Sequence, residues 1–82
     1  MGWGMEVKLS ELEPGEEGVV VRVEGPPALR RRLMEMGIVR GTKIKMVRRA
    51  PLGDPIEYEV KGYNLSLRAE EADGVYVEVA RP

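Results

Sequence analysis

The sequence contains no cysteine and no histidine among its 82 residues. Without thiol and imidazole side chains, the chain can form no disulfide, no zinc-finger site and no catalytic Ser–His or Cys–His pair. A metal ion would have only carboxylate and carbonyl oxygens to bind, and these hold the softer first-row metals weakly. The acidic clusters Glu16-Glu17 and Glu70-Glu71-Asp73 are not spaced to converge on one ion. We therefore predict no metal site and no required cofactor.

Long apolar runs and phosphate-binding motifs are also missing. No segment approaches the ~20 apolar residues of a membrane helix, and the first residues lack the apolar region of a signal peptide, so we expect a cytoplasmic protein. The glycines form neither a G-x-x-x-x-G-K-[ST] nor a G-x-G-x-x-G motif, which argues against nucleotide binding. Because no nucleophile and base assemble, we do not expect an enzyme.

What is present is a pattern of short β-strands. Five segments rich in β-branched or alternating apolar residues are separated by turn signals: 18–24, 43–49, 56–60, 64–68 and 75–79. Such short strands predict a single domain over residues 1–82, mainly β with one α-helix, built as a small five-stranded barrel. Residues 1–8 are expected to be a poorly ordered start. In the first strand we expect Val19, Val21 and Val23 to face the core.

The segments 43–49 and 56–60 are predicted to pair as a hairpin. Their alternation predicts two facing sets of side chains: a core set of Ile44, Met46, Tyr58 and Val60, and an outer set of Lys43, Lys45, Glu57 and Glu59. Opposite charges across two strands stabilise the pair by ~0.2–1 kcal/mol each. Much of the positive charge of this region would thereby be neutralised within the protein.

One helix is predicted between the first two strands, from Pro27 to Met36. Its apolar positions recur at i, i+4 and i+7, the spacing of a helix face that packs on a core. Gly37 stands where a left-handed residue ends a helix, and the apolar residue after it can contact the last turn. The residues expected to be structural, in the helix, at its end and in the bend after the segment 56–60, are Leu29, Leu33, Met36, Gly37, Ile38 and Gly62.

The charges are arranged in blocks. Residues 26–49 carry eight basic residues against Glu35 alone, and both flanking segments are acidic. This basic block makes a small nucleic-acid-binding barrel one alternative function. The net charge of −1 and the lack of aromatic residues within the block favour instead acidic strands that fold back on the basic one. We therefore expect no nucleic-acid partner.

Several motifs, taken in their order and spacing, resemble those of one family. They are Leu9-Ser10-Glu11-Leu12 with Pro14-Gly15, the run Arg-Leu-Met-Glu-Met-Gly-Ile at 32–38, Gly41-Thr42, Ala-Pro-Leu-Gly-Asp-Pro at 50–55, Gly62-Tyr63, and Leu65-Ser66-Leu67-Arg68 with Glu71-Ala72. Together they span residues 9 to about 79 and resemble the FeoA family.

The resemblance to FeoA implies an SH3-like barrel with the helix inserted after the first strand. It implies a cytoplasmic, non-enzymatic accessory role in ferrous iron uptake, with the membrane transporter FeoB as partner. It also implies association with transition-metal ions, and it leaves homo-oligomers open. A similar domain forms the C-terminal part of metal-dependent repressors of the diphtheria-toxin-repressor type. A detached metal-responsive regulatory domain of this kind is therefore a further alternative.

Two surfaces are candidates for partner binding. On the predicted helix, Arg30, Arg31 and Met34 lie away from the apolar stripe, and a methionine between arginines is typical of interfaces. A single exposed methionine is equally common on ordinary surfaces. The loop 50–55 offers Leu52 and Asp54, either as a contact loop or as a connection that its prolines and glycine stiffen.

Overall fold

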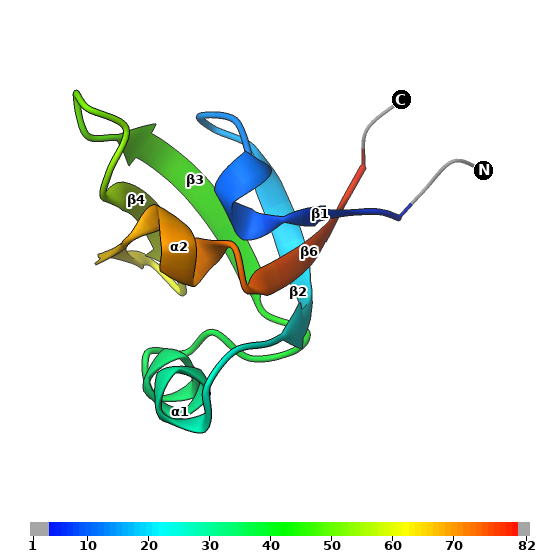
Figure 1. Cartoon of the computed structure of the whole chain (residues 1–82). Coiled ribbons are helices and arrows are strands. Elements are labelled where there is room, and N and C mark those ends of the chain that lie inside the picture. The colour runs from blue at the N-terminus through cyan, green and yellow to red at the C-terminus, as the bar shows by residue number, and fades with distance from the viewer. Residues whose placement is uncertain (1–3, 81–82) are drawn as a thin grey trace.

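The computed structural model describes residues 4–80, which form an antiparallel β-barrel with one main helix outside it (Figure 1). The elements follow the order β1 (Met5–Lys8), the 3-10 helix η1 (Leu9–Glu11), β2 (Glu17–Val23), α1 (Pro27–Glu35), β3 (Lys43–Arg49), β4 (Ile56–Val60), β5 (Tyr63–Leu67), α2 (Ala69–Ala72) and β6 (Val75–Val79). The strands make one sheet in the order β1-β6-β2-β3-β4-β5. The prediction of a small, mainly β barrel with one main helix is confirmed. The barrel has six strands rather than five, and the helix follows the second strand, because β1 precedes the segment that was predicted as the first strand.

The sheet curls around one apolar core. The buried residues of this core come from every strand except β1, from both helices, from η1 and from the segments that follow η1 and α1. They are Leu9, Leu12, Val20, Leu33, Ile38, Ile44, Met46, Ile56, Tyr58, Val60, Leu67, Ala72, Val75, Val77 and Val79. Tyr58 is fully buried, and its hydroxyl donates a hydrogen bond of 3.2 Å to the carbonyl oxygen of Leu9. Burial also raises the pKa of the Tyr58 hydroxyl. The tyrosine is thus part of the core, as the alternation predicts.

Strand β1 is an addition to the five expected strands. Residues 1–8 were expected to be a poorly ordered start, but Met5–Lys8 pairs along β6, with Met5 opposite Val79 and Lys8 opposite Tyr76. Its apolar–charged alternation is only four residues long, too short to predict a strand by itself, and the strand forms through backbone pairing with a distant strand. Residues 1–3 lie outside the part that the structure describes.

The inward face of β2 differs from the prediction at Val19 and Val21, whereas Val23 packs against the core as predicted. Val20 is buried and lies opposite Val77, whereas Val19 is 37% exposed and lies opposite Glu78. Val21 is an extra residue in a bulge, so that the pairing resumes with Arg22 opposite Tyr76. Three consecutive valines fit either face equally well, and the bulge then returns Val23 to the core side. The sequence alternation alone therefore could not determine the register.

The hairpin of β3 and β4 has the expected core side, with Ile44 opposite Val60 and Met46 opposite Tyr58. On its outer face, Lys45 lies opposite Glu59, 3.7 Å from its carboxylate, as expected. A bulge after Met46 also brings Arg48 opposite Glu57, and the two side chains form an ion pair at 2.9 Å. Lys43 is exposed and lies opposite Val19 of β2.

Helix α1 ends as the sequence predicts. Gly37 has a φ of +92°, and the N–H of Ile38 donates to the carbonyl oxygen of Leu33 at 2.9 Å. The N–H of Gly37 donates to Met34 at 3.0 Å, which completes a Schellman ending. Leu33 is buried, and Leu29 and Met36 pack against the core from the same side. This stripe attaches α1 to one end of the barrel.

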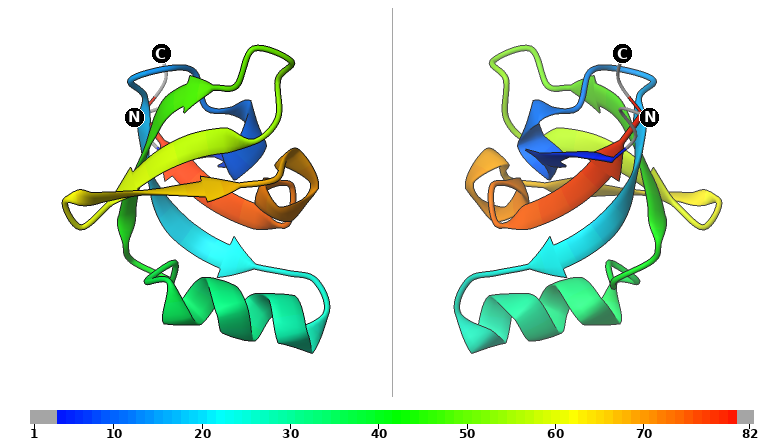
Figure 2. Two further views of the ribbon diagram at one scale, coloured as in Figure 1. Left: turned by 90° about the vertical axis from the view of Figure 1, so that its left-hand side faces the viewer. Right: turned by 90° about the vertical axis from the view of Figure 1, so that its right-hand side faces the viewer.

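The two predicted contact surfaces lie at opposite ends of the molecule. Figures 1 and 2 show α1 at one end of the barrel and the β3–β4 connection at the other.

The connection between β4 and β5 is a tight turn, in which Lys61 and Gly62 both have positive φ. Gly62 is therefore a turn residue, as expected.

Candidate functional site

A groove of about 510 Å³ lies between α1, the end of β2 and the segment that follows α1. Its lining residues are Val21, Arg22 and Val23 from β2, Pro27, Arg30, Arg31 and Met34 from α1, and Ile38, Val39 and Arg40 from the connection to β3. This surface of α1 is distinct from the stripe that packs on the core. The arrangement combines an apolar floor with four arginines.

The apolar floor is built around Met34. Its side chain is 57% exposed, although Leu33 beside it in the sequence is fully buried. Val21, the extra residue of the β2 bulge, and Val39 contribute further apolar surface to the groove. The bulge therefore contributes to the site, because it places a valine between the strand and the helix. Because its side chain is exposed and flexible, Met34 can adapt to an apolar side chain that another molecule places against this floor.

Two of the four arginines are held by neighbours within the protein. Arg22 pairs with Glu6 at 2.8 Å and with Glu24 at 2.7 Å, and its guanidinium lies 4.1 Å from the ring centre of Tyr76. The hydrogen bond that Arg22 donates through Nε to the Glu24 carboxylate is the main cause that raises the pKa of Arg22, and Glu6 adds to it. Arg30 donates through Nε to the carbonyl oxygen of Gly25 at 3.1 Å. Arg22 thus forms part of the wall, with its charge largely balanced.

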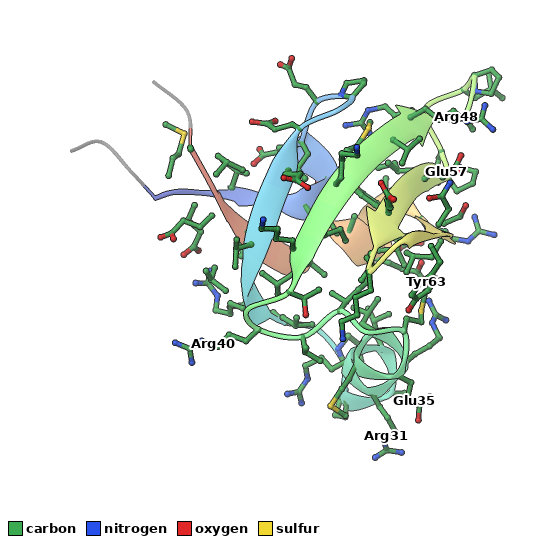
Figure 3. The ribbon with its side chains drawn as sticks, turned by 180° about the vertical axis from the view of Figure 1, so that it is seen from behind. Arg31, Glu35, Arg40, Arg48, Glu57 and Tyr63 are labelled. Atoms are coloured by element: carbon green, nitrogen blue, oxygen red, sulfur yellow. The ribbon has the colours of Figure 1, made fainter. Side chains whose placement is uncertain are left out.

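The guanidinium groups of the other two arginines, Arg31 and Arg40, have no ion pair or hydrogen bond to any described residue. Figure 3 shows Arg31 extending from α1 and Arg40 from the connection before β3, both outward from the fold. Glu35 follows Arg31 by one turn, but it forms no ion pair with Arg31 and does not line the groove. Within residues 4–80 no acidic side chain lines the groove, so its charge is positive.

Helix α1 is tied to the barrel on its other side by polar contacts. The Tyr63 hydroxyl donates to the carbonyl oxygen of Met36 at 2.6 Å. Arg32 pairs with Glu71 of α2. The backbone N–H of Arg68, at 2.9 Å, is the main cause that lowers the pKa of Glu71, and Arg32 lowers it further. These contacts fix the orientation of α1 and hence the shape of the groove.

The loop 50–55 is separate from this groove. Leu52 is 97% exposed at its tip. Asp54 accepts a hydrogen bond of 2.8 Å from the backbone N–H of Ala69, so its carboxylate holds the loop to the start of α2. A smaller hollow of about 160 Å³ lies below the loop, beside the Arg48–Glu57 pair that Figure 3 labels.

The structure thus divides the five partner-binding residues predicted from the sequence. Arg30, Arg31 and Met34 come together in the groove, whereas Leu52 and Asp54 lie at the far end. Sequence reasoning missed Arg40 and the β2 residues Val21 and Arg22. Only the basic block 26–49 pointed toward Arg40. The short connection between Val23 and Pro27 was the signal that could have placed β2 beside the helix, since consecutive elements are usually neighbours in space.

The described residues show neither a metal centre nor a membrane helix. In residues 4–80 no three acidic side chains are grouped so that they could hold a metal ion. No helix in that same part of the chain is long and apolar enough to cross a membrane.

Known proteins that resemble this chain define both its fold class and its family. The fold is that of an SH3-like domain, and a structure of Stenotrophomonas maltophilia FeoA complexed with zinc is described as a procaryotic SH3 domain protein. That structure is 36% identical, with a TM-score of 0.76, and the match covers 87% of this chain and 88% of the other. The model of the FeoA domain matches residues 7–79, so the chain belongs to the FeoA family.

Two further relatives support this assignment. The solution structure of FeoA from Chlorobium tepidum is 51% identical, with a TM-score of 0.84 over 89% of this chain and 70% of the other. A fusion of Fe(2+) transport protein A with the Fe(2+) transporter FeoB from Porphyromonas gingivalis is 48% identical over 73 residues, 89% of this chain. The match spans only 9% of that fusion protein. A manganese-dependent transcriptional repressor shares the fold alone, at 19% identity and a TM-score of 0.83, with coverage of 95% of this chain and 43% of the repressor.

Proposed function

We propose that this protein is a non-enzymatic accessory domain of ferrous iron uptake that docks on the cytosolic side of a FeoB-type transporter. The observation that carries the proposal is the Porphyromonas gingivalis fusion, in which a homologous domain and the transporter form one chain. Domains that are joined in one chain are held at a high effective concentration, which suits domains that act on each other. The name of the same fusion protein also links the FeoA family to Fe(2+) transport.

The groove beside α1 is the docking surface in this proposal. An exposed methionine with arginines around it has the composition of a protein interface. Met34 would enter an apolar contact on the transporter, and Arg31 would guide the approach of an acidic surface. The proposal requires no bound metal, and the zinc in the Stenotrophomonas structure is a property of that protein.

The test is binding of the purified protein to the cytosolic domain of a FeoB-type transporter and to the whole transporter in detergent. Met34→Asp should mainly speed dissociation, because it places a charge in a desolvated contact. Arg31→Glu should mainly slow association and change its salt dependence, because rim charges steer encounter. Both residues are exposed and lie off the core stripe, so the melting temperature should stay nearly unchanged.

Two matched controls are available in the same chain. Leu52→Asp places the same charge at an exposed apolar residue at the far end of the barrel, and Lys43→Glu reverses an exposed charge outside the groove. Both controls should bind like the wild type. Loss of binding in Leu52→Asp with wild-type binding in Met34→Asp would move the docking surface to the loop 50–55. No binding of the wild type to either form of the transporter would refute the proposed function.

A further inference from the structure

We infer that the groove recognises a linear segment of the partner that carries a bulky apolar side chain with carboxylates on either side. The inference rests on the proposed docking function and specifies the chemistry of what docks. It follows from three properties of the groove: its size, its unbalanced charge and the lack of aromatic residues among its lining residues.

The size and floor of the groove suit an apolar side chain. A volume of about 510 Å³ falls within the range of sites that enclose a small organic group. Val21, Met34 and Val39 line it, and they come from three separate segments of the fold. Insertion of a leucine-sized group would remove apolar surface from water on both partners. Met34, which is more than half exposed, would lose exposed apolar surface on this side.

The charge requires acidic groups on the occupant. Arg31 and Arg40 belong to different segments and lack ion-pair partners among the described residues, so their guanidinium groups are available. Guanidinium groups bind carboxylates through paired, charge-assisted hydrogen bonds. An acidic segment meets no repulsion from the lining, since no described carboxylate belongs to it. Arg22, already balanced by Glu6 and Glu24, supplies the wall and little net attraction.

A protein segment fits these observations better than a nucleic acid does. Binding of single-stranded nucleic acid relies on aromatic side chains on which bases stack. Among the described lining residues there is no aromatic side chain, while the floor is aliphatic. The phosphate backbone would find two available arginines and no surface for its bases.

The test uses fluorescein-labelled twelve-residue peptides of defined composition and fluorescence anisotropy with the full chain. The probe contains glutamate and leucine in an alanine background. One comparison peptide has lysine in place of glutamate, and a second has serine in place of leucine. The probe should bind saturably and about tenfold or more tightly than either comparison peptide. Binding should weaken as salt is added, since solvent-exposed charges are screened.

Variants assign the binding to the groove. Arg31→Glu, Arg40→Glu and Met34→Asp should each weaken the probe about tenfold, and the double arginine variant should also lose most of the salt dependence. Lys43→Glu should bind like the wild type. In the ¹⁵N spectrum, the probe should shift the amides of Arg31, Met34 and Arg40. Melting temperatures within a few degrees of the wild type would show that the variants are folded.

The results that would contradict the linear-segment inference differ from those that would contradict the docking function. Equal binding of the lysine peptide, unchanged binding in the double arginine variant, or tighter binding of an oligothymidine would overturn the inference. If the same variants lose transporter binding while no peptide binds, docking stands and the linear-segment inference falls. If the peptides bind as expected but the transporter does not, the inference stands and the docking function falls.

Discussion

The hydroxyl of Tyr63 in β5 donates a hydrogen bond of 2.6 Å to the backbone carbonyl oxygen of Met36, the residue that ends α1. The last carbonyl oxygens of a helix have no partner within the helix, so this side chain satisfies one of them. The bond joins the β4–β5 hairpin to α1, although Tyr63 itself is 47% exposed. The groove on the other side of α1 depends on this attachment.

Tyr63→Phe removes the hydroxyl and leaves the ring. We expect a loss of about 0.5–1.5 kcal/mol in the free energy of unfolding, the usual value of one hydrogen bond. Chemical denaturation measures this loss. Exchange of the amide hydrogens of α1 should also become faster than in the wild type, because α1 loses one of its attachments. Unchanged exchange in α1 would show that its packing alone positions it.

Gly37→Val should destabilise the protein by a few kcal/mol. The φ of +92° at Gly37 is disfavoured for any residue with a Cβ atom and most of all for a β-branched one. A Cβ atom here would also lie 3.3 Å from the Tyr63 hydroxyl. Gly53→Val is the matched control, since Gly53 has a φ of +91° with nothing within 4 Å of its Cβ position. The loss at Gly37 should exceed the loss at Gly53 in thermal unfolding, and the reverse order would contradict the role of this contact.

The register of β2 can be tested by a pair of neighbouring substitutions. Val20→Ala should cost about 2 kcal/mol, because Val20 is buried. Val19→Ala should cost much less, because Val19 is on the outer face opposite Glu78. At roughly 4–8 °C per kcal/mol for a domain of this size, the melting temperatures should separate clearly. Equal losses would mean that both valines contribute equally to the core.

Glu71→Gln should lower stability in a pH-dependent way. The pKa of Glu71 in the folded protein lies below its ordinary value of 4.5, mainly through the N–H of Arg68. Its carboxylate therefore stabilises the fold above that value, and the contribution is lost as the pH falls through the folded-state pKa. We expect a loss of ~0.5–1 kcal/mol at pH 7, since the pair with Arg32 is partly exposed. Denaturation at pH 7 and at pH 3 should show this difference shrinking, and a constant difference would assign it to another cause.

Local patterns in the sequence predict the parts of the fold that depend on local interactions. The helix ending at Gly37 is encoded within a few residues, because the glycine and the apolar residue after it define a Schellman motif. The β3–β4 hairpin follows from alternation on both strands, which fixes the core side through Met46 and Tyr58. In the first case a single turn of the chain determines where the helix ends, and in the second the apolar face of each strand determines which side packs on the core.

The remaining features depend on partners that are distant in the sequence. The run of valines in β2 permits two registers, and only the pairing with β6 and its bulge selects one. Strand β1 exists because β6 pairs with it. The groove is a different case, because its lining residues all lie between Val21 and Arg40, but the helix supplies only Arg31, Met34 and their neighbours, and the segments before and after it supply the rest. A helical pattern describes one side of such a site but not its opposite wall.

The pairing of Met5 with Val79 also determines how this domain can be linked to another. Both ends of the described chain leave the barrel side by side, away from α1 (Figure 1). A tether from either end must pass around a molecule whose longest dimension is 36 Å, which about eleven extended residues can span. A flexible tether somewhat longer than this keeps the linked domain at an effective concentration near millimolar at the groove. A groove of only modest intrinsic affinity would then be filled in a fused chain, whereas separate chains at micromolar concentration would exchange freely.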